Sequence, residues 1–123
     1  MGEALTIEVR HEQGYAIVAV AGEIDISTVT GLRECLFELA ASGRPLLVDL
    51  DQVTFIDSAG LSVLVGTAKR AAAHGGSLYA ACARPKIRKL FRLTGLDRRI
   101  PLARTLDEAR EAREALAART APS

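Results

Sequence analysis

The sequence lacks tryptophan and has few residues that could build a metal or redox centre. Aromatic residues make up 4% of its 123 residues, and its two cysteines are Cys35 and Cys82. The cysteines lie far apart and form no C-x-x-C pair, so their spacing gives neither a zinc site nor a redox motif. Each stands among apolar neighbours, and we expect two reduced core thiols rather than a disulfide.

Long apolar runs are also missing. No stretch reaches the length of about 18 apolar residues that a membrane span needs. The N-terminus has no basic region followed by an apolar run, so no signal peptide is predicted. We therefore expect a cytoplasmic protein that is not attached to a membrane.

Neither sign of charge dominates, because 16 Lys and Arg face 15 Asp and Glu for a formal net charge of +1. No global field draws in nucleic acid or an anionic membrane. Basic residues do gather locally, at Arg84, Lys86, Arg88, Lys89, Arg92, Arg98 and Arg99. Without tryptophan or a recognition-helix arrangement, this cluster favours a solvated or protein-contact face over direct DNA binding.

The length and the 49% apolar content are typical of one compact domain. Hydrophobic periodicity predicts strands at 5–11, 15–20, 46–50, 78–83 and 100–103. Apolar residues at helical spacing predict three helices, from Ser27 to Gly43, over 58–74 and from Pro85 to Gly95. A fourth helix is predicted to begin at Thr105, which has capping-box spacing with Glu108.

The predicted order is β-β-α-β-α-β-α-β-α. Alternating strands and helices predict a single α/β domain at residues 5–115 with a mixed, mainly parallel sheet. The first two strands should form an antiparallel hairpin closed at Gly14, where a positive φ is expected. Residues 116–123 show no periodicity and predict a flexible C-terminal tail.

One segment combines an apolar run with small and polar residues, Asp57-Ser58-Ala59-Gly60, and passes directly into a helix. Ser58 is expected at the helix N-terminus, where unpaired N–H groups and the macrodipole stabilise an anion such as phosphate. Small Ala59 and Gly60 would leave its hydroxyl accessible. Equally, Asp57 or Ser58 could simply be an N-cap.

A second acidic cluster, Gly22-Glu23-Ile24-Asp25, stands before the first helix. Loops at the carboxyl ends of neighbouring parallel strands converge. If the two strands involved are neighbours, Asp25 and Asp57 flank Ser58. Asp25 could also serve only to cap the helix that begins near Ser27.

No catalytic motif is complete. Ile56 occupies the first glycine position of G-x-S-x-G, and His11 and His74 are expected in a hairpin and at a helix end, which disfavours a Ser-His-Asp triad. Asp49-Leu50-Asp51 is followed by Gln52 rather than the Gly-Thr of two-aspartate phosphatases. Neither G-x-G-x-x-G nor a P-loop occurs. We expect no enzymatic activity, no cofactor and no metal.

Four motifs in order resemble the STAS domains of bacterial anti-sigma factor antagonists: GEID at 22–25, TFIDSAGL at 54–61, Gly75-Gly76, and KLFRLTGL at 89–96. The resemblance covers about residues 5–115. In that family a kinase-type anti-sigma factor phosphorylates the serine of Asp-Ser-x-Gly, which implies Ser58 here. The acid that closes the GEID-like motif lies beside it, which implies Asp25. Many members have Ser or Thr where Ala59 stands, so Ser58 would be the single acceptor.

The resemblance implies a partner-switching regulator of stress-response transcription. Its unphosphorylated form would bind an anti-sigma factor serine kinase and release a sigma factor, phosphorylation of Ser58 would switch it off, and a serine phosphatase would reset it. The expected contact residues are Glu23, Asp25, Ser27, Thr28, Asp57, Ser58, Ala59, Gly60 and Leu61. The alternative is a STAS subunit of a transport or stress-sensing assembly that acts as a constitutive interaction module. The sequence assigns no oligomeric state.

Overall fold

A computed structural model describes residues 4–120 of the chain. It has a 5-stranded sheet in the order β1-β2-β3-β4-β5, with β1 antiparallel to β2 and the other neighbours parallel. The strands are β1 (Thr6–Glu12), β2 (Tyr15–Ile24), β3 (Leu46–Ile56), β4 (Leu78–Ala81) and β5 (Leu102–Ala103). The helices are α1 (Val29–Ala40), α2 (Ser58–Ala73), α3 (Pro85–Thr94) and α4 (Leu106–Thr120), with a 3₁₀ helix at Leu96–Arg98.

This arrangement confirms the predicted α/β class, the element order and the antiparallel hairpin. The 3₁₀ helix was not predicted. Gly14 closes the hairpin with φ 87° between the paired residues Glu12 and Tyr15. Pro85 is the first residue of α3, and Gly95 ends that helix with φ 74°, as the sequence indicated.

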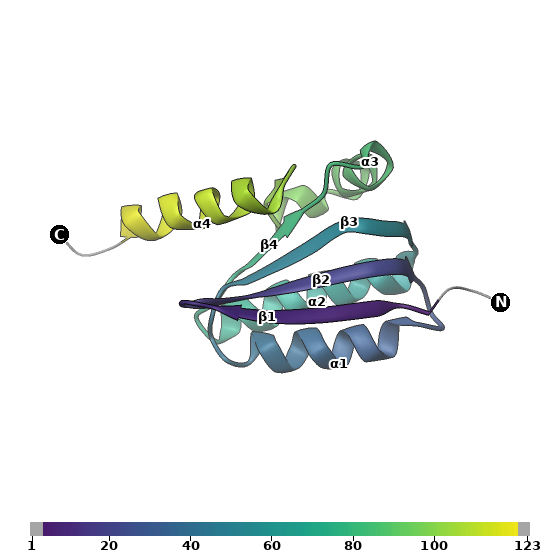
Figure 1. The fold of residues 1–123 in the computed structure, drawn as a ribbon, viewed down its shortest axis with the longest axis horizontal. Helices are drawn as coiled ribbons and strands as arrows, with labels where there is room; N and C mark the ends of the chain where they lie inside the picture. Colours follow the sequence, from purple (N-terminus) through teal and green to yellow (C-terminus); the bar gives the residue numbers. More distant parts are fainter. Residues whose placement is uncertain (1–3, 121–123) are drawn as a thin grey trace.

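Both faces of the central strands are covered (Figure 1). Successive side chains of β2 point to opposite faces. Val18 belongs to a core that it shares with side chains of α1, α2 and α3, including Phe91. Ile17 points the other way and packs in a smaller cluster with Tyr79 and with Ala109 of α4. The strand that begins at Leu46 therefore lies in the middle of a three-layer sandwich, as its continuous apolar run predicted.

The third strand is longer than its predicted span of 46–50. Only its first half is a central strand with a neighbouring strand on each side. Asp49 pairs with Ala81, the last residue of β4, and beyond this point β3 pairs with β2 alone. Polar Gln52 and Thr54 are exposed there. Two register shifts against β2 also break the alternation of apolar and polar residues. For this reason the sequence pattern did not predict the second half of the strand.

Polar contacts hold α4 on the sheet, because its apolar face is small. The guanidinium Nη2 of Arg110 lies 2.6 Å from Oε1 of Glu12. The other carboxylate oxygen of Glu12 accepts a hydrogen bond of 2.7 Å from the Tyr15 hydroxyl. The Arg113 guanidinium lies 4.9 Å from the centroid of the Tyr15 ring, a cation–π contact.

The helix α4 extends to Thr120, so the structure differs from the predicted boundary at residue 116, where a flexible tail was expected. Residues 106–120 are rich in Ala, Glu and Arg. These are strong helix formers that sustain a helix without an apolar stripe. The remainder of the expected tail, residues 121–123, lies outside the described residues.

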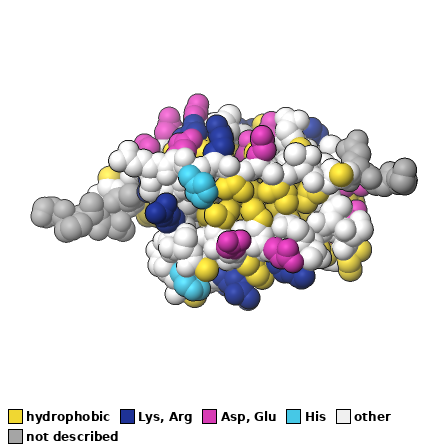
Figure 2. Space-filling model, turned by 60° about the horizontal axis from the view of Figure 1, so that its bottom comes forward, with side chains coloured by type: hydrophobic (Ala, Val, Ile, Leu, Met, Phe, Trp, Pro, Cys, Tyr) yellow, Lys and Arg dark blue, Asp and Glu magenta, His cyan; other side chains and the backbone are white. Residues whose placement is uncertain are grey.

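The face that includes α1 carries a strip of apolar side chains across its middle (Figure 2). Leu5, just before β1, Ile7 of β1, and Cys35 and Leu39 of α1 are partly buried and pack against the core. Cys35 and Cys82 are free thiols, as expected. Burial raises the pKa of both, which keeps them protonated at neutral pH.

The Glu12→Gln variant should loosen α4, because Arg110 loses its charged partner. The Tyr15 hydroxyl first, and then Arg110, hold the pKa of Glu12 below its ordinary value of 4.5, against an opposing effect of desolvation. A carboxylate with a lowered folded-state pKa stabilises the fold above its unfolded pKa, and this contribution is lost as the pH falls through the folded value. Amide hydrogen exchange in α4 should be faster in the variant at pH 7. The difference from the wild type should vanish as the pH falls well below 4.5.

The matched control is Glu8→Gln, an exposed position on the same strand. It should leave α4 exchange unchanged. Equal exchange rates in the two variants at pH 7 would show that the Glu12 carboxylate does not hold α4.

Candidate functional site

Asp57 links two loops at the carboxyl ends of β2 and β3. Its Oδ1 accepts a 3.1 Å hydrogen bond from the N–H of Gly60, which caps α2. Its Oδ2 accepts one of 3.1 Å from the N–H of Ile26, which is 31 residues away in sequence. The Asp57 N–H also donates to the carbonyl of Ile24 at 3.1 Å. Asp57, rather than Ser58, is therefore the cap, and it fixes the loop after β2 against the start of α2.

Asp25 holds that loop in a closed turn. Its Oδ1 accepts hydrogen bonds from the Ser27 hydroxyl at 2.6 Å, the Ser27 N–H at 2.9 Å and the Thr28 N–H at 3.1 Å. The Thr28 hydroxyl donates to the carbonyl of Glu23 at 2.8 Å and accepts the Asp25 N–H at 3.0 Å. The N-cap of α1 is Thr28, without a side-chain cap bond, so Asp25 shapes the turn that precedes the helix.

The same hydrogen bonds determine the charge of Asp25. Those from Ser27, the hydroxyl first, and from Thr28 hold the pKa of Asp25 below its ordinary value of 3.8, against an opposing effect of desolvation. The carboxylate is therefore ionised at neutral pH. A second negative charge placed beside it meets electrostatic repulsion.

Gly60 allows α2 to begin directly against the strand ends. A Cβ atom at this buried position would lie 2.7 Å from Cγ2 of Ile24 and 2.8 Å from Cγ2 of Ile56. Both neighbours are themselves buried core side chains. The glycine of the Asp-Ser-x-Gly motif is thus required by packing, and it brings the first turn of α2 close to the 22–28 loop.

Ser58 is the first residue of α2 and its side chain is exposed. Within residues 4–120, its hydroxyl forms no hydrogen bond, and the backbone N–H groups of Ser58 and Ala59 have no acceptor. These N–H groups stand at the positive end of the helix macrodipole. The hydroxyl is therefore accessible to an incoming reagent, and an anionic group on it would meet free donors.

Ile26 is the residue that sequence reasoning missed. Its side chain is 80% exposed at the tip of the loop, beside the N-terminus of α2. It lies at one end of a groove of about 500 Å³ lined by Ile26, Val29, Thr30, Arg33, Phe37, Ala59, Ser62 and Val63. The sequence feature that could have indicated Ile26 is its position: it is an apolar residue directly after GEID that fits neither the strand period nor the helix period.

The structure brings the two predicted loops together. Some of their residues are exposed and others are buried. Ser27 and Ser58 are exposed, and Ala59 lines the groove. Gly60 is buried, and Leu61 is partly buried against the core, so these two expected contact residues support the surface more than they form it. Among residues 4–120, no group of three or more His, Cys, Asp or Glu side chains could hold a metal ion. No helix in the same range is long and apolar enough to cross a membrane.

The fold and the two linked loops define a small α/β domain with a surface site at the carboxyl end of its sheet. Residues 6–109 match the sequence model of the STAS domain. The chain belongs to the STAS domain family. The members it resembles, the anti-sigma factor antagonists, are regulatory binding proteins rather than enzymes.

Named relatives are close in sequence and in structure. The anti-sigma-B factor antagonist of Bacillus subtilis is 38% identical over 92 residues, which is 75% of this chain and 84% of the relative. An anti-sigma factor antagonist from Mycobacterium paratuberculosis superposes with a TM-score of 0.81 at 34% identity, covering 89% of this chain and 93% of the other.

A third neighbour, SpoIIAA of Bacillus, has been solved in two forms. The unphosphorylated form superposes with a TM-score of 0.74 at 20% identity, over 89% of this chain and 97% of that one. The phosphorylated form gives 0.68 at 21% identity, over 87% and 98%. At these identities the likeness establishes the fold.

Gly60→Ala should lower the free energy of unfolding by about 1–3 kcal/mol, since the new methyl group overpacks the contact with Ile24 and Ile56. Gly31→Ala is the matched control, because a Cβ there meets nothing within 4 Å. Because Gly31 is at an exposed position of α1, its replacement by Ala should instead raise the free energy of unfolding by about 0.5–1 kcal/mol. Urea unfolding measures both. An unchanged free energy of unfolding in Gly60→Ala would mean that the start of α2 does not pack closely on the strand ends.

Proposed function

We propose that this protein is an anti-sigma factor antagonist controlled by phosphorylation of Ser58. The unphosphorylated form binds an anti-sigma factor that is also a serine kinase, and this releases a sigma factor. The kinase transfers the terminal phosphoryl group of ATP to Oγ of Ser58, and the modified protein leaves. A serine phosphatase hydrolyses the ester and restores the binding form.

The observation that carries this proposal is the position of Ser58. Its hydroxyl is exposed, unbonded within residues 4–120, and adjacent to an apolar groove that begins at Ala59. Asp57 takes over the capping of α2, so Ser58 is not needed as a cap. A serine whose hydroxyl has no structural role can be modified without loss of the fold.

Charge explains how the modification would end binding. A phosphoryl group adds about −1.5 to −2 charges at neutral pH. The free N–H groups at the start of α2 accommodate this charge within the protein. At a contact with a partner, the same charge lies near Asp25 and Asp57 and beside the apolar groove, where it must be desolvated. Phosphorylation therefore opposes docking while the domain stays folded.

The groove between α1 and α2 fits a partner that inserts apolar side chains. Ile26 projects at its end, and Phe37 and Val63 line it. An apolar side chain that a partner encloses in a desolvated pocket can act as an interface anchor. The loop that carries Ile26 is held by Asp57 and Asp25, so its conformation is already organised for binding.

The names of relatives agree with this proposal. The Bacillus subtilis relative is an anti-sigma-B factor antagonist, and the structural neighbour SpoIIAA exists in phosphorylated and unphosphorylated forms. These properties belong to those proteins. Together with the position of Ser58, they favour the switch over a constitutive subunit of a transport assembly.

Ser58→Ala should retain the partner, and Ser58→Asp should lose it, because only the second places a charge at the start of α2. The measurement is affinity capture from host lysate with wild-type and variant baits, with mass spectrometry of the captured proteins and of Ser58 in the wild-type bait. Circular dichroism should show both variants folded. An unfolded Ser58→Asp would assign Ser58 a structural role.

Ser42→Asp controls for added charge, since it places a carboxylate at an exposed serine beyond the end of α1. It should capture the same ATPase-type anti-sigma factor as the wild type. Retention of identical transport or stress-assembly subunits by all baits would instead favour the constitutive interaction module.

Ile26→Ala should weaken binding to the captured anti-sigma factor by about tenfold, because the loop loses its projecting apolar anchor. Leu93→Ala is the matched control, as Leu93 is 70% exposed on α3. Neither change should alter thermal stability measurably, since both side chains are in solvent. Equal affinities of the two variants in titration calorimetry would place the partner surface elsewhere.

A further inference from the structure

A cavity of about 360 Å³ lies beside α3 and collects positive charge from two segments of the chain. It is lined by Ala83, Pro85, Arg88, Lys89, Arg92 and Arg104. Three of the basic residues come from α3, and Arg104 follows β5. The cavity shares no lining residue with the groove beside Ser58. The Ser58 switch therefore leaves this concentration of charge unexplained.

Arg88 is fixed in the wall of the cavity. Its Nη1 donates hydrogen bonds to the carbonyl oxygens of Cys82, directly after β4, at 2.9 Å and of Ala103, the last residue of β5, at 3.2 Å. A guanidinium has five N–H donors. The two on Nη1 are used, and those on Nε and Nη2 have no acceptor within the described part of the chain, residues 4–120. The group is thus oriented in advance and keeps donors available.

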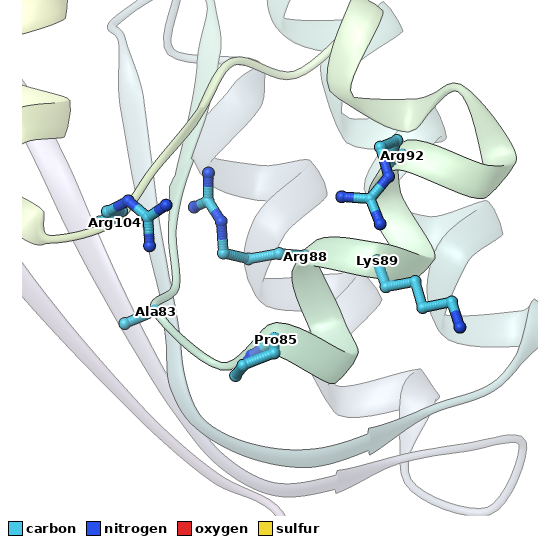
Figure 3. A pocket seen from close by; sticks show the side chains of 6 residues that line it. All are labelled: Ala83, Pro85, Arg88, Lys89, Arg92 and Arg104. Carbon is cyan, nitrogen blue, oxygen red and sulfur yellow. The ribbon is translucent and has the colours of Figure 1, made fainter.

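The other basic side chains differ in direction (Figure 3). The guanidinium groups of Arg88 and Arg104 point toward one another, and that of Arg92 turns toward the same space, whereas the Lys89 side chain extends away. Three positive groups therefore converge in one hollow. Like charges at close range repel, and an anion between them removes the repulsion.

The three arginines form no ion pair within the described residues. In the range 4–120, none of Arg88, Arg92 and Arg104 takes part in one. Asp49 and Asp51 line an adjoining cavity that shares Ala83 and Arg104. Oδ1 of Asp51 accepts the Ala83 N–H at 2.9 Å and Oδ1 of Asp49 accepts the Asp51 N–H at 3.0 Å, so both carboxylates are bonded to backbone donors. The arginines thus stand ready for an external anion.

We propose that this cavity binds a diphosphate group. Arginine binds phosphate oxygens through paired, planar N–H donors, and three converging guanidinium groups suit an anion with more than one phosphate. The volume is within the range of about 300–1,000 Å³ found for small-ligand sites. Its apolar lining consists of Ala83 and Pro85, which offer no aromatic ring for stacking a nucleobase. The diphosphate alone therefore supplies the affinity, and the inference does not rest on the proposed function.

The test is titration calorimetry of the whole protein with sodium pyrophosphate at physiological ionic strength. The wild type should bind one equivalent. The double variant Arg92→Gln/Arg104→Gln should bind at least about tenfold more weakly, since it loses two charge-assisted contacts. The control Arg10→Gln/Arg44→Gln removes the same net charge at two exposed positions and should bind as the wild type does. Urea unfolding should show that both variants fold.

A further arm, titration with ADP, tests the source of the diphosphate. ADP should bind within about threefold of pyrophosphate, because no aromatic side chain lines the cavity in the described structure. ADP binding more than tenfold tighter would overturn the inference that the diphosphate alone supplies the affinity. Absence of binding by the wild type, or equal weakening by both double variants, would overturn the proposal.

Discussion

The two oxygens of the Asp57 carboxylate organise the candidate functional surface, since one accepts a backbone N–H from the loop after β2 and the other accepts one from the first turn of α2. Parallel pairing of β2 with β3 brings the strand ends together, with Ile24 beside Ile56. The hydrogen bonds of Asp57 then hold the loop after β2 against the start of α2. Gly60 completes it, because any side chain there would push α2 away from the strand ends. The exposure of Ser58 and the projection of Ile26 both follow from this arrangement.

The two faces of the sheet are held by different forces. The face under α1 and α2 is closed by a large apolar core, so the candidate partner surface is built on a rigid base. The face under α4 is closed by a small apolar cluster and by the ion pair between Glu12 and Arg110. Acid and salt therefore weaken the ion pair that helps to close the second face.

A formal net charge of +1 conceals two opposite environments. The two loops beside Ser58 carry the acids Asp25 and Asp57, and Arg33 lines the neighbouring groove, so a phosphate on Ser58 adds charge to a surface that already holds two carboxylates. Beside α3 the groups are arginines without acidic partners in the described chain. The same chemical group, a phosphate, would therefore oppose docking of a partner at one surface and be retained as a ligand at the other. Local arrangement, and not total charge, separates the two responses.

Much of this protein is encoded in short windows of sequence. The period of apolar residues predicted the strands and helices, Gly14 marked a positive φ, Gly95 marked the end of α3, and the GEID and DSAG motifs marked the two loops. The length of β3, the exposure of Ile26, the choice of Asp57 as cap and the convergence of Arg88 with Arg104 depended on the tertiary structure. Each of these arises where segments distant in sequence meet, such as Asp57 with Ile26 across 31 residues. Local patterns carry backbone conformation and burial, whereas contacts between distant segments exist only once the sheet has set their register.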